Sequence, residues 1–232
     1  MTEKFHFLQT VFQKLPFFLD HFLPKFLLIY LPKQELSLDE AMINWQGWLR
    51  YKTYNPGKLT KHRILVWMIS KSETGYICHL EIYTGEGKKL QETILLVLQA
   101  YLHSQYHIYK DNYYNSMPTS EILLKNKSGV CGTIRQSWLP NQLKEKSKNL
   151  QRGEMTFFRK GEVILIWKDK RLFCMMKTIC DASIASTGEE DRRTGHQVTK
   201  PTCILEYNKY VKGLIQSISG NLQYLLKNSK MI

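Results

Sequence analysis

Two aspartates stand where strands could present them to a phosphate group. Asp39 lies in the run Leu36 to Met42, and Asp111 directly follows the short run His107 to Lys110, so both read as carboxylates at strand ends. Carboxylates placed in this way can hold two Mg²⁺ ions about 3.5–4 Å apart, as enzymes that cleave and join phosphodiester bonds do. The same positions also suit two ordinary loop aspartates that cap turns.

A two-metal site needs a further carboxylate from a later helix. The natural place for it is the segment from Tyr207 to Ile232, which contains neither Asp nor Glu. The sequence therefore predicts the scaffold of a nuclease-like site without its full set of metal ligands.

The bulk composition fits a globular protein with a polyanionic partner. A length of 232 residues suits one domain or one domain with an insertion, and 43% of the residues are hydrophobic. The net charge of +13 favours nucleic acid, although a solvated basic surface would have the same charge. Five cysteines without a C-x-x-C spacing argue against disulfides and zinc fingers, and favour a reducing compartment, the nucleus or the cytoplasm.

Residues 1–34 are expected to form a helical lead-in segment. Its stretch of Phe and Leu is interrupted by Pro16, Pro24 and Pro32 and by charged residues, which argues against a membrane span. The opening residues also make a poor signal peptide. The segment could instead be an apolar surface for a protein partner.

Alternating strand and helix patterns over residues 35–136 predict an α/β domain with a mixed sheet. A basic polar loop is expected between Arg50 and Lys61. The expected strands are Leu36–Trp45, Ile64–Ser70, Tyr76–Tyr83, His107–Lys110 and Val130–Ile134, and the expected helices are Lys88–Leu102 and Pro118–Lys125.

Residues 137–199 differ in character and predict a β-rich insertion. Its expected strands are Glu154–Arg159, Val163–Lys168 and Leu172–Ile179, followed by a polar loop from Thr187 to Lys200. Residues 200–232 are expected to return to the main domain as a helix from Ile204 to Leu226.

Five segments stand out when they are taken in order. They begin at Glu35 (Glu-Leu-Ser-Leu-Asp-Glu-Ala-Met-Ile), Tyr109 (Tyr-Lys-Asp-Asn-Tyr-Tyr-Asn-Ser), Gly132 (Gly-Thr-Ile-Arg), Trp167 (Trp-Lys-Asp-Lys-Arg) and Lys200 (Lys-Pro-Thr-Cys-Ile-Leu-Glu-Tyr-Asn-Lys-Tyr). Together they resemble segments of the piggyBac transposase family, over about Leu15 to Ser217. The resemblance implies a ribonuclease H-like fold, a β-rich insertion before the last catalytic helix, and three aspartates that bind Mg²⁺ for DNA cleavage and strand transfer.

The resemblance maps the first two metal-binding aspartates to Asp39 and Asp111 and the third to Ile215. An aliphatic side chain cannot bind a metal, so we expect weak Mg²⁺ binding if any, no resident cofactor and no useful strand-transfer activity. Glu206 is the nearest acid, but nine residues along a helix place it roughly 13 Å away on the opposite face.

The resemblance and the charge together predict weak DNA binding of low specificity. Lys110 replaces a Thr or Ser that often precedes the second family aspartate. It could lower the pKa of Asp111 as a counter-charge, or it could simply be a solvated strand end. The candidate DNA-binding residues are Lys52, Lys58, Lys61, Arg63, Lys110, Lys168, Lys170 and Arg171.

Two alternatives remain open from the sequence. The chain could be an active Mg²⁺-dependent DNA nuclease or transposase with an unrecognised third ligand. It could also be a protein-interaction module that uses the apolar N-terminal segment, or a transposon fragment without a function.

Overall fold

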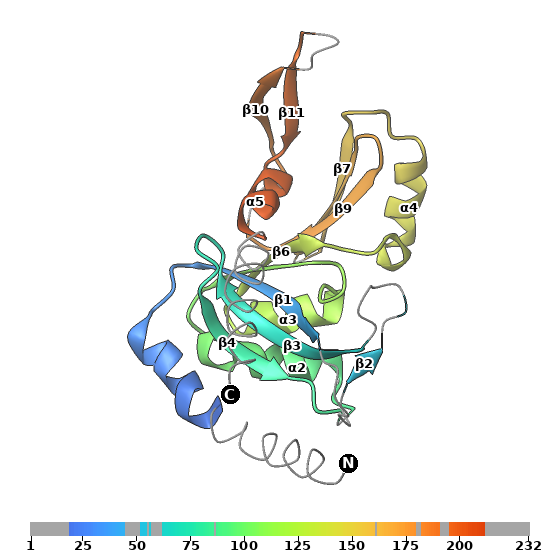
Figure 1. The fold of residues 1–232 in the computed structure, drawn as a ribbon. Coiled ribbons are helices and arrows are strands. Elements are labelled where there is room, and N and C mark those ends of the chain that lie inside the picture. The colour runs from blue at the N-terminus through green and yellow to red at the C-terminus, as the bar shows by residue number, and fades with distance from the viewer. Residues whose placement is uncertain are drawn as a thin grey trace.

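A mixed sheet of nine strands runs through the part of the chain that the computed structural model describes (Figure 1). The described residues are 19–44, 52–54, 56, 62–85, 87–160, 162–179, 182–190 and 195–211. The strand order is β2-β3-β1-β5-β6-β9-β8-β7, and β4 also pairs with β3. β1 runs antiparallel to β3 but parallel to β5, and β5 runs parallel to β6.

The structure contains every strand and helix that the sequence predicts for residues 35–136, with most of their ends shifted. The two-residue strand β2 is additional to that prediction, and the last turn of the helix expected over Lys88–Leu102 is a 3-10 turn, η1. The elements are β1 (Glu35–Asn44), β2 (Thr53–Tyr54), β3 (His62–Lys71), β4 (Ile77–Ile82), α2 (Leu90–Leu98), η1 (Gln99–Tyr101), β5 (His107–Lys110), α3 (Met117–Lys125) and β6 (Gly129–Thr133).

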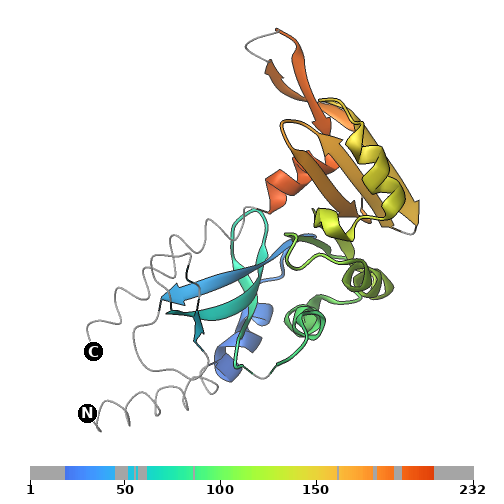
Figure 2. The same ribbon diagram turned by 90° about the vertical axis from the view of Figure 1, so that its right-hand side faces the viewer.

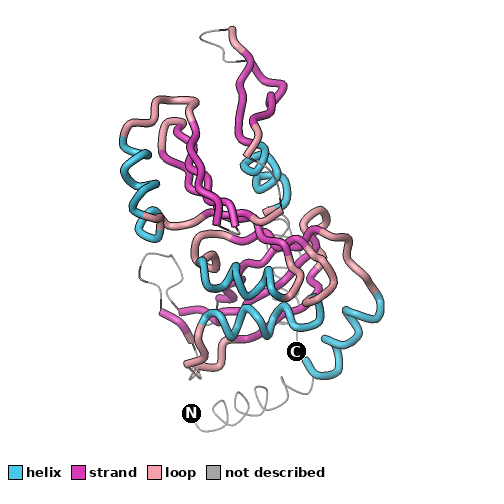
Figure 3. The backbone as a smooth tube through the Cα atoms, turned by 180° about the vertical axis from the view of Figure 1, so that it is seen from behind, coloured by secondary structure: helices cyan, strands magenta, loops and turns pink. Residues whose placement is uncertain are grey.

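Alternation along the central strands divides the residues between two faces of the sheet. On β1, Leu36 and Leu38 are buried in one core with Ile108 of β5. Helices α2 and α3 contribute Ile94, Val97, Leu98 and Leu123 to this core, and they cover this face of the sheet in Figure 3. Ser37 and Asp39 therefore belong to the opposite face, where the Ser37 hydroxyl donates to the carbonyl of Val211.

The predicted β-rich insertion contains its three expected strands, and it continues the main sheet. Strand β9 pairs antiparallel with β6, so that Gly132 lies opposite Met176. Helix α4 was not predicted, because its sequence is almost entirely polar; only Leu143 on it is buried. The elements are η2 (Gln136–Trp138), α4 (Asn141–Lys148), β7 (Met155–Lys160), β8 (Glu162–Lys168) and β9 (Leu172–Lys177).

The prediction of a polar loop from Thr187 to Lys200 is wrong. The described residues on either side of 191–194 form a two-stranded antiparallel ribbon, β10 (Ile184–Glu190) and β11 (Gln197–Pro201). Figure 2 shows the ribbon extending beyond the strands of the insertion. Helix α5 (Thr202–Tyr210) begins immediately after the ribbon, and the rest of the predicted final helix lies outside the described residues.

A helix over residues 19–29 precedes the sheet. The rings of Phe26 and Tyr30 lie 6.3 and 4.6 Å from that of Tyr76, which precedes β4, so the helix packs against the β3–β4 hairpin. Leu28 and Leu31 are 83% and 80% exposed. Residues 1–18 lie outside the described part of the chain. Within that part, no helix is both long and apolar enough to cross a membrane.

Candidate functional site

The register between β1 and β5 brings Asp39 and Asp111 together. Leu38 pairs with Lys110 at the end of this parallel ladder, so the next residues along the two strands are the two aspartates. Asp39 lies in the middle of β1, which corrects the expectation that it ends a strand. Asp111 does follow the last residue of β5, and its Oδ1 accepts a hydrogen bond of 2.8 Å from the N–H of Tyr113. Asp111 thus also caps the turn that follows.

Burial and mutual repulsion make both aspartates weaker acids. Burial, followed by the neighbouring Glu40 and then Asp111, raises the pKa of Asp39 to about 7, although a hydrogen bond from the Glu40 N–H opposes this. Burial and the charge of Glu40 likewise raise the pKa of Asp111, against hydrogen bonds from two backbone N–H groups and the charge of Arg135. Three carboxyl groups therefore influence one another at this edge of β1.

Glu40 and Tyr114 complete the polar cluster beside the two aspartates. The phenol of Tyr114 donates a 2.6 Å hydrogen bond to Oε2 of Glu40. Burial and the charges of Glu40, Asp39 and Asp111 raise the pKa of this phenol, so it remains a donor. The sequence did not single out either residue, although Glu40 adjoins Asp39 and Tyr114 lies within the second quoted segment.

Lys110 lies on the face of the sheet opposite the aspartates. Its side chain is 0% exposed, and its Nζ donates to the carbonyl of Tyr114 at 3.3 Å. Burial lowers the pKa of Lys110 to about 7. Because the side chain of Lys110 is buried, the prediction that it contacts DNA is wrong, and so is the prediction of a solvated strand end. The pKa of Asp111 is raised, and not lowered as the idea of Lys110 as a counter-charge predicts.

Helix α5 covers the aspartate face and directs Tyr207 at the pair. Burial raises the pKa of Tyr207 to about 12, against a hydrogen bond with Thr133, and the charges of Asp111 and Asp39 add to the rise. The ring of Tyr210 packs against that of Tyr109 of β5, with centroids 4.9 Å apart and the ring planes tilted by 40°. Tyr207 and Arg135 are thus the neighbours that sequence reasoning missed on this face, though both stand in the quoted segments.

The described residues do not form a complete magnesium site. Asp39 and Asp111 supply oxygen donors of the type that Mg²⁺ prefers. Among the described residues, however, no three His, Cys, Asp or Glu side chains form a group that could hold an ion. Ile215, the position to which the resemblance maps the third ligand, lies outside the described part of the chain.

The predicted DNA-binding residues fall into two separate groups. Lys52 and Arg63 are half-buried beside β2 and at the start of β3. Lys168 is the last residue of β8, and Lys170 and Arg171 are exposed in the turn between β8 and β9. Strands β1, β5 and β6 lie between the two groups. Lys58 and Lys61 lie outside the described residues.

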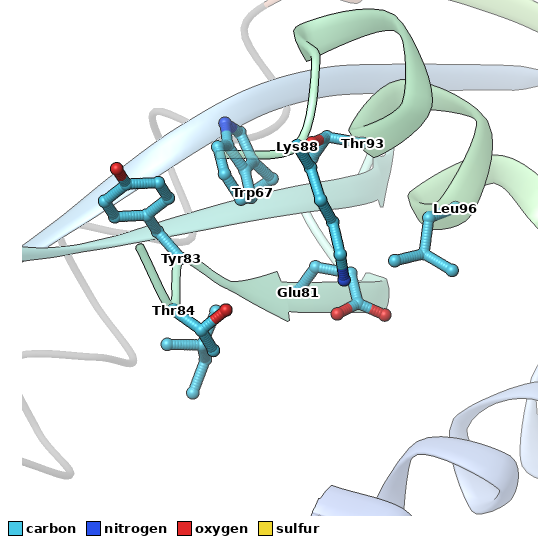
Figure 4. A pocket seen from close by; sticks show the side chains of 8 residues that line it. Trp67, Glu81, Tyr83, Thr84, Lys88, Thr93 and Leu96 are labelled. Atoms are coloured by element: carbon cyan, nitrogen blue, oxygen red, sulfur yellow. The ribbon is translucent and has the colours of Figure 1, made fainter. Parts of the chain in front are cut away.

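A small cavity lies away from the aspartates, between β3, β4 and α2 (Figure 4). Its volume of about 20 Å³ is enough for one water molecule but not for a nucleotide. Trp67 lines it, and its buried Nε1 finds no hydrogen-bond partner among the residues that the structure describes. The edge of Trp67 meets the ring of Tyr83 at a centroid distance of 5.5 Å. The aspartate pair therefore remains the stronger candidate for a functional site.

Comparisons with known proteins agree with this architecture. A sequence profile of the family described as Transposase IS4 matches residues 7–230. Among solved structures, the fold is similar to that in a cryo-EM structure of a piggyBac transposase synaptic complex with hairpin DNA, with a TM-score of 0.68 and 23% identity. The match covers 81% of this chain and 40% of that chain. The likeness confirms the predicted ribonuclease H-like mixed sheet.

Proposed function

Because the chain belongs to the piggyBac-type transposase IS4 family, we propose that it is a transposase-derived domain that binds DNA without cleaving or joining it. The observation that carries this proposal is the missing acid. The family's third metal-binding position maps to Ile215, and no Asp or Glu occurs from Tyr207 to the last residue of the sequence. Asp39 and Asp111 are then the remnant of a larger ligand set.

The loss of one carboxylate has a chemical consequence for phosphoryl transfer. A two-metal mechanism requires both ions in place, one beside the attacking oxygen and one beside the leaving oxygen. Isoleucine offers no donor atom and no charge to hold an ion against the substrate phosphate. Removing such a group commonly costs several kcal/mol of transition-state stabilisation. Binding to DNA makes no such demand, because it depends on lysines and arginines of the protein that neutralise the negatively charged phosphate backbone.

Charge supports the binding half of the proposal. The chain carries 33 Lys and Arg against 20 Asp and Glu. Lys170 and Arg171 project from the insertion, and Lys52 and Arg63 lie at the other end of the sheet. Because these two groups of basic residues lie apart, each would contact the phosphate backbone, which is the same for every DNA sequence, and would not recognise particular bases. We therefore expect weak, sequence-tolerant binding.

Two assays test the two halves of the proposal. In a gel-shift titration, affinity for duplex DNA should fall by orders of magnitude between roughly 50 and 200 mM salt, as counterion release requires. An absence of binding at low salt would refute the DNA-binding half. In a plasmid-nicking assay with Mg²⁺, the wild-type chain should be indistinguishable from Asp111→Asn. Metal-dependent nicking by the wild type that Asp111→Asn abolishes would refute the loss of activity.

Glu40 supports a second candidate function, metal-dependent DNA cleavage. Its backbone N–H donates to Oδ1 of Asp39, and its carboxyl group acts electrostatically on both Asp39 and Asp111, so it is an acid already near the pair. To serve as a third ligand it would have to leave its hydrogen bond with Tyr114. Under this alternative, nicking would require Mg²⁺, and Glu40→Gln would abolish it as completely as Asp111→Asn.

A further inference from the structure

An exposed tryptophan stands on a short turn that follows β6. Trp138 ends the 3-10 turn η2, and 42% of its surface is exposed. The turn is anchored on both sides, because Ile134 and Leu139 are buried at 4% and 5% exposure in the core beneath α4. The N–H of Trp138 also donates to the carbonyl of Arg135 at 3.0 Å. The indole is thus presented to solvent by a backbone that is held in place.

Two cations flank this indole. The guanidinium carbon of Arg135 lies 5.6 Å from the centroid of the Trp138 ring, a cation–π arrangement. From α4, Nζ of Lys144 donates to the carbonyl of Ser137 at 3.0 Å. Arg135, which precedes the turn, also acts electrostatically on Asp111. An aromatic surface and two positive charges therefore meet on the turn that follows β6.

We propose that Trp138 is a stacking platform for an unpaired DNA base, with Arg135 and Lys144 binding the adjacent phosphates. This inference rests on the proposed DNA binding. Every base has a flat π-face, so stacking on an aromatic side chain needs no particular sequence. Bases inside an intact duplex are stacked on their neighbours, and only an unpaired or extruded base can use the platform. Duplex binding would then depend on the cations alone.

The test is an equilibrium binding measurement on the full chain with two labelled probes, a short single strand of mixed sequence and the matching duplex. Trp138→Ala should weaken single-strand binding by about tenfold, the typical effect of removing one base–aromatic stack, and leave duplex binding unchanged. Trp138→Phe should keep most of the single-strand affinity. The matched control is Phe157→Ala, which removes an equally exposed aromatic ring, 49% exposed, from the outermost strand β7.

The outcomes separate this inference from the proposed function. If the wild type binds neither probe, DNA binding itself fails and the platform fails with it. If the wild type binds both probes and Trp138→Ala binds them equally well, DNA binding stands and the platform is refuted. Equal losses on both probes, or an equal loss in Phe157→Ala, would also refute stacking at Trp138. Thermal unfolding of each variant shows whether a loss of binding reflects a loss of fold.

Discussion

Replacing Lys110 with methionine should stabilise the protein at neutral pH. Lys110 is fully buried and its ammonium donates to the Tyr114 carbonyl. Methionine keeps a long apolar side chain in the same space but carries no charge, so the change removes the cost of burying an ammonium ion. The free energy of unfolding should therefore increase, which is unusual for a substitution in a protein core.

The size of the effect follows from the pKa of Lys110. Burial lowers it from 10.5 to about 7. At about 1.4 kcal/mol per pKa unit, this difference corresponds to roughly 4 kcal/mol of lost stability at pH 7. Against this, the Tyr114 carbonyl loses its Lys110 donor, which costs about 1–3 kcal/mol. The expected net gain for Lys110→Met is therefore on the order of 1–3 kcal/mol at pH 7.

The pH dependence gives a sharper measurement, because it is independent of the lost hydrogen bond. The folded pKa of Lys110 lies below the unfolded value, so between these two values the unfolded chain binds more protons than the folded one. Stability therefore rises with pH across this window, and Lys110 alone should add about 2 kcal/mol between pH 7 and 9. Urea unfolding at both pH values should show this rise in the wild type and in Lys125→Met, an exposed control on α3. Parallel profiles for Lys110→Met and the wild type would refute the reasoning.

Two further substitutions probe the packing around the aspartates. Tyr114→Phe removes the 2.6 Å hydrogen bond to Glu40, and it should lower the free energy of unfolding in urea by about 1–2 kcal/mol; an unchanged value would mean that this bond contributes nothing. Gly132→Ala should cost roughly 3 kcal/mol or more, because the new methyl group would overlap the backbone carbonyl oxygen of Lys110. Gly129→Ala is its control and should cost less in the same melts, since there the methyl group meets only side-chain atoms.

The main sheet could be predicted because its strands carry apolar residues in the expected pattern. The run Ile64–Ser70 lies within β3, and Val130 to Ile134 marks β6 within one residue. The closeness of Asp39 and Asp111 was expected from the family resemblance. What produces it is the register in which Leu38 lies beside Lys110, and no local pattern in the sequence specifies a register between strands so far apart.

The elements that were not predicted from the sequence contribute few side chains to the hydrophobic cores. Strand β10 reads Ile-Ala-Ser-Thr-Gly-Glu-Glu, and none of its residues is buried, so it lacks the apolar alternation that marks a half-buried strand. The ribbon instead depends on backbone pairing with β11. Lys110 was misplaced for the opposite reason. A lysine normally lies at the surface, but here the loop that contains Tyr114 covers it.

The described part of α5 bears on whether another acid could replace the missing one. Desolvation lowers the pKa of His107, and the charges of Glu35 and Glu206 oppose this, so Glu206 acts at the start of β5. Asp111 follows the other end of that strand. The next residue of the helix, Tyr207, lies near both aspartates and offers a phenol with a pKa of about 12, which is not ionised at neutral pH. The raised pKa of Asp39 and the positive charge of Arg135 therefore reduce the charge repulsion within the pair, whereas Glu206 acts on the far end of β5.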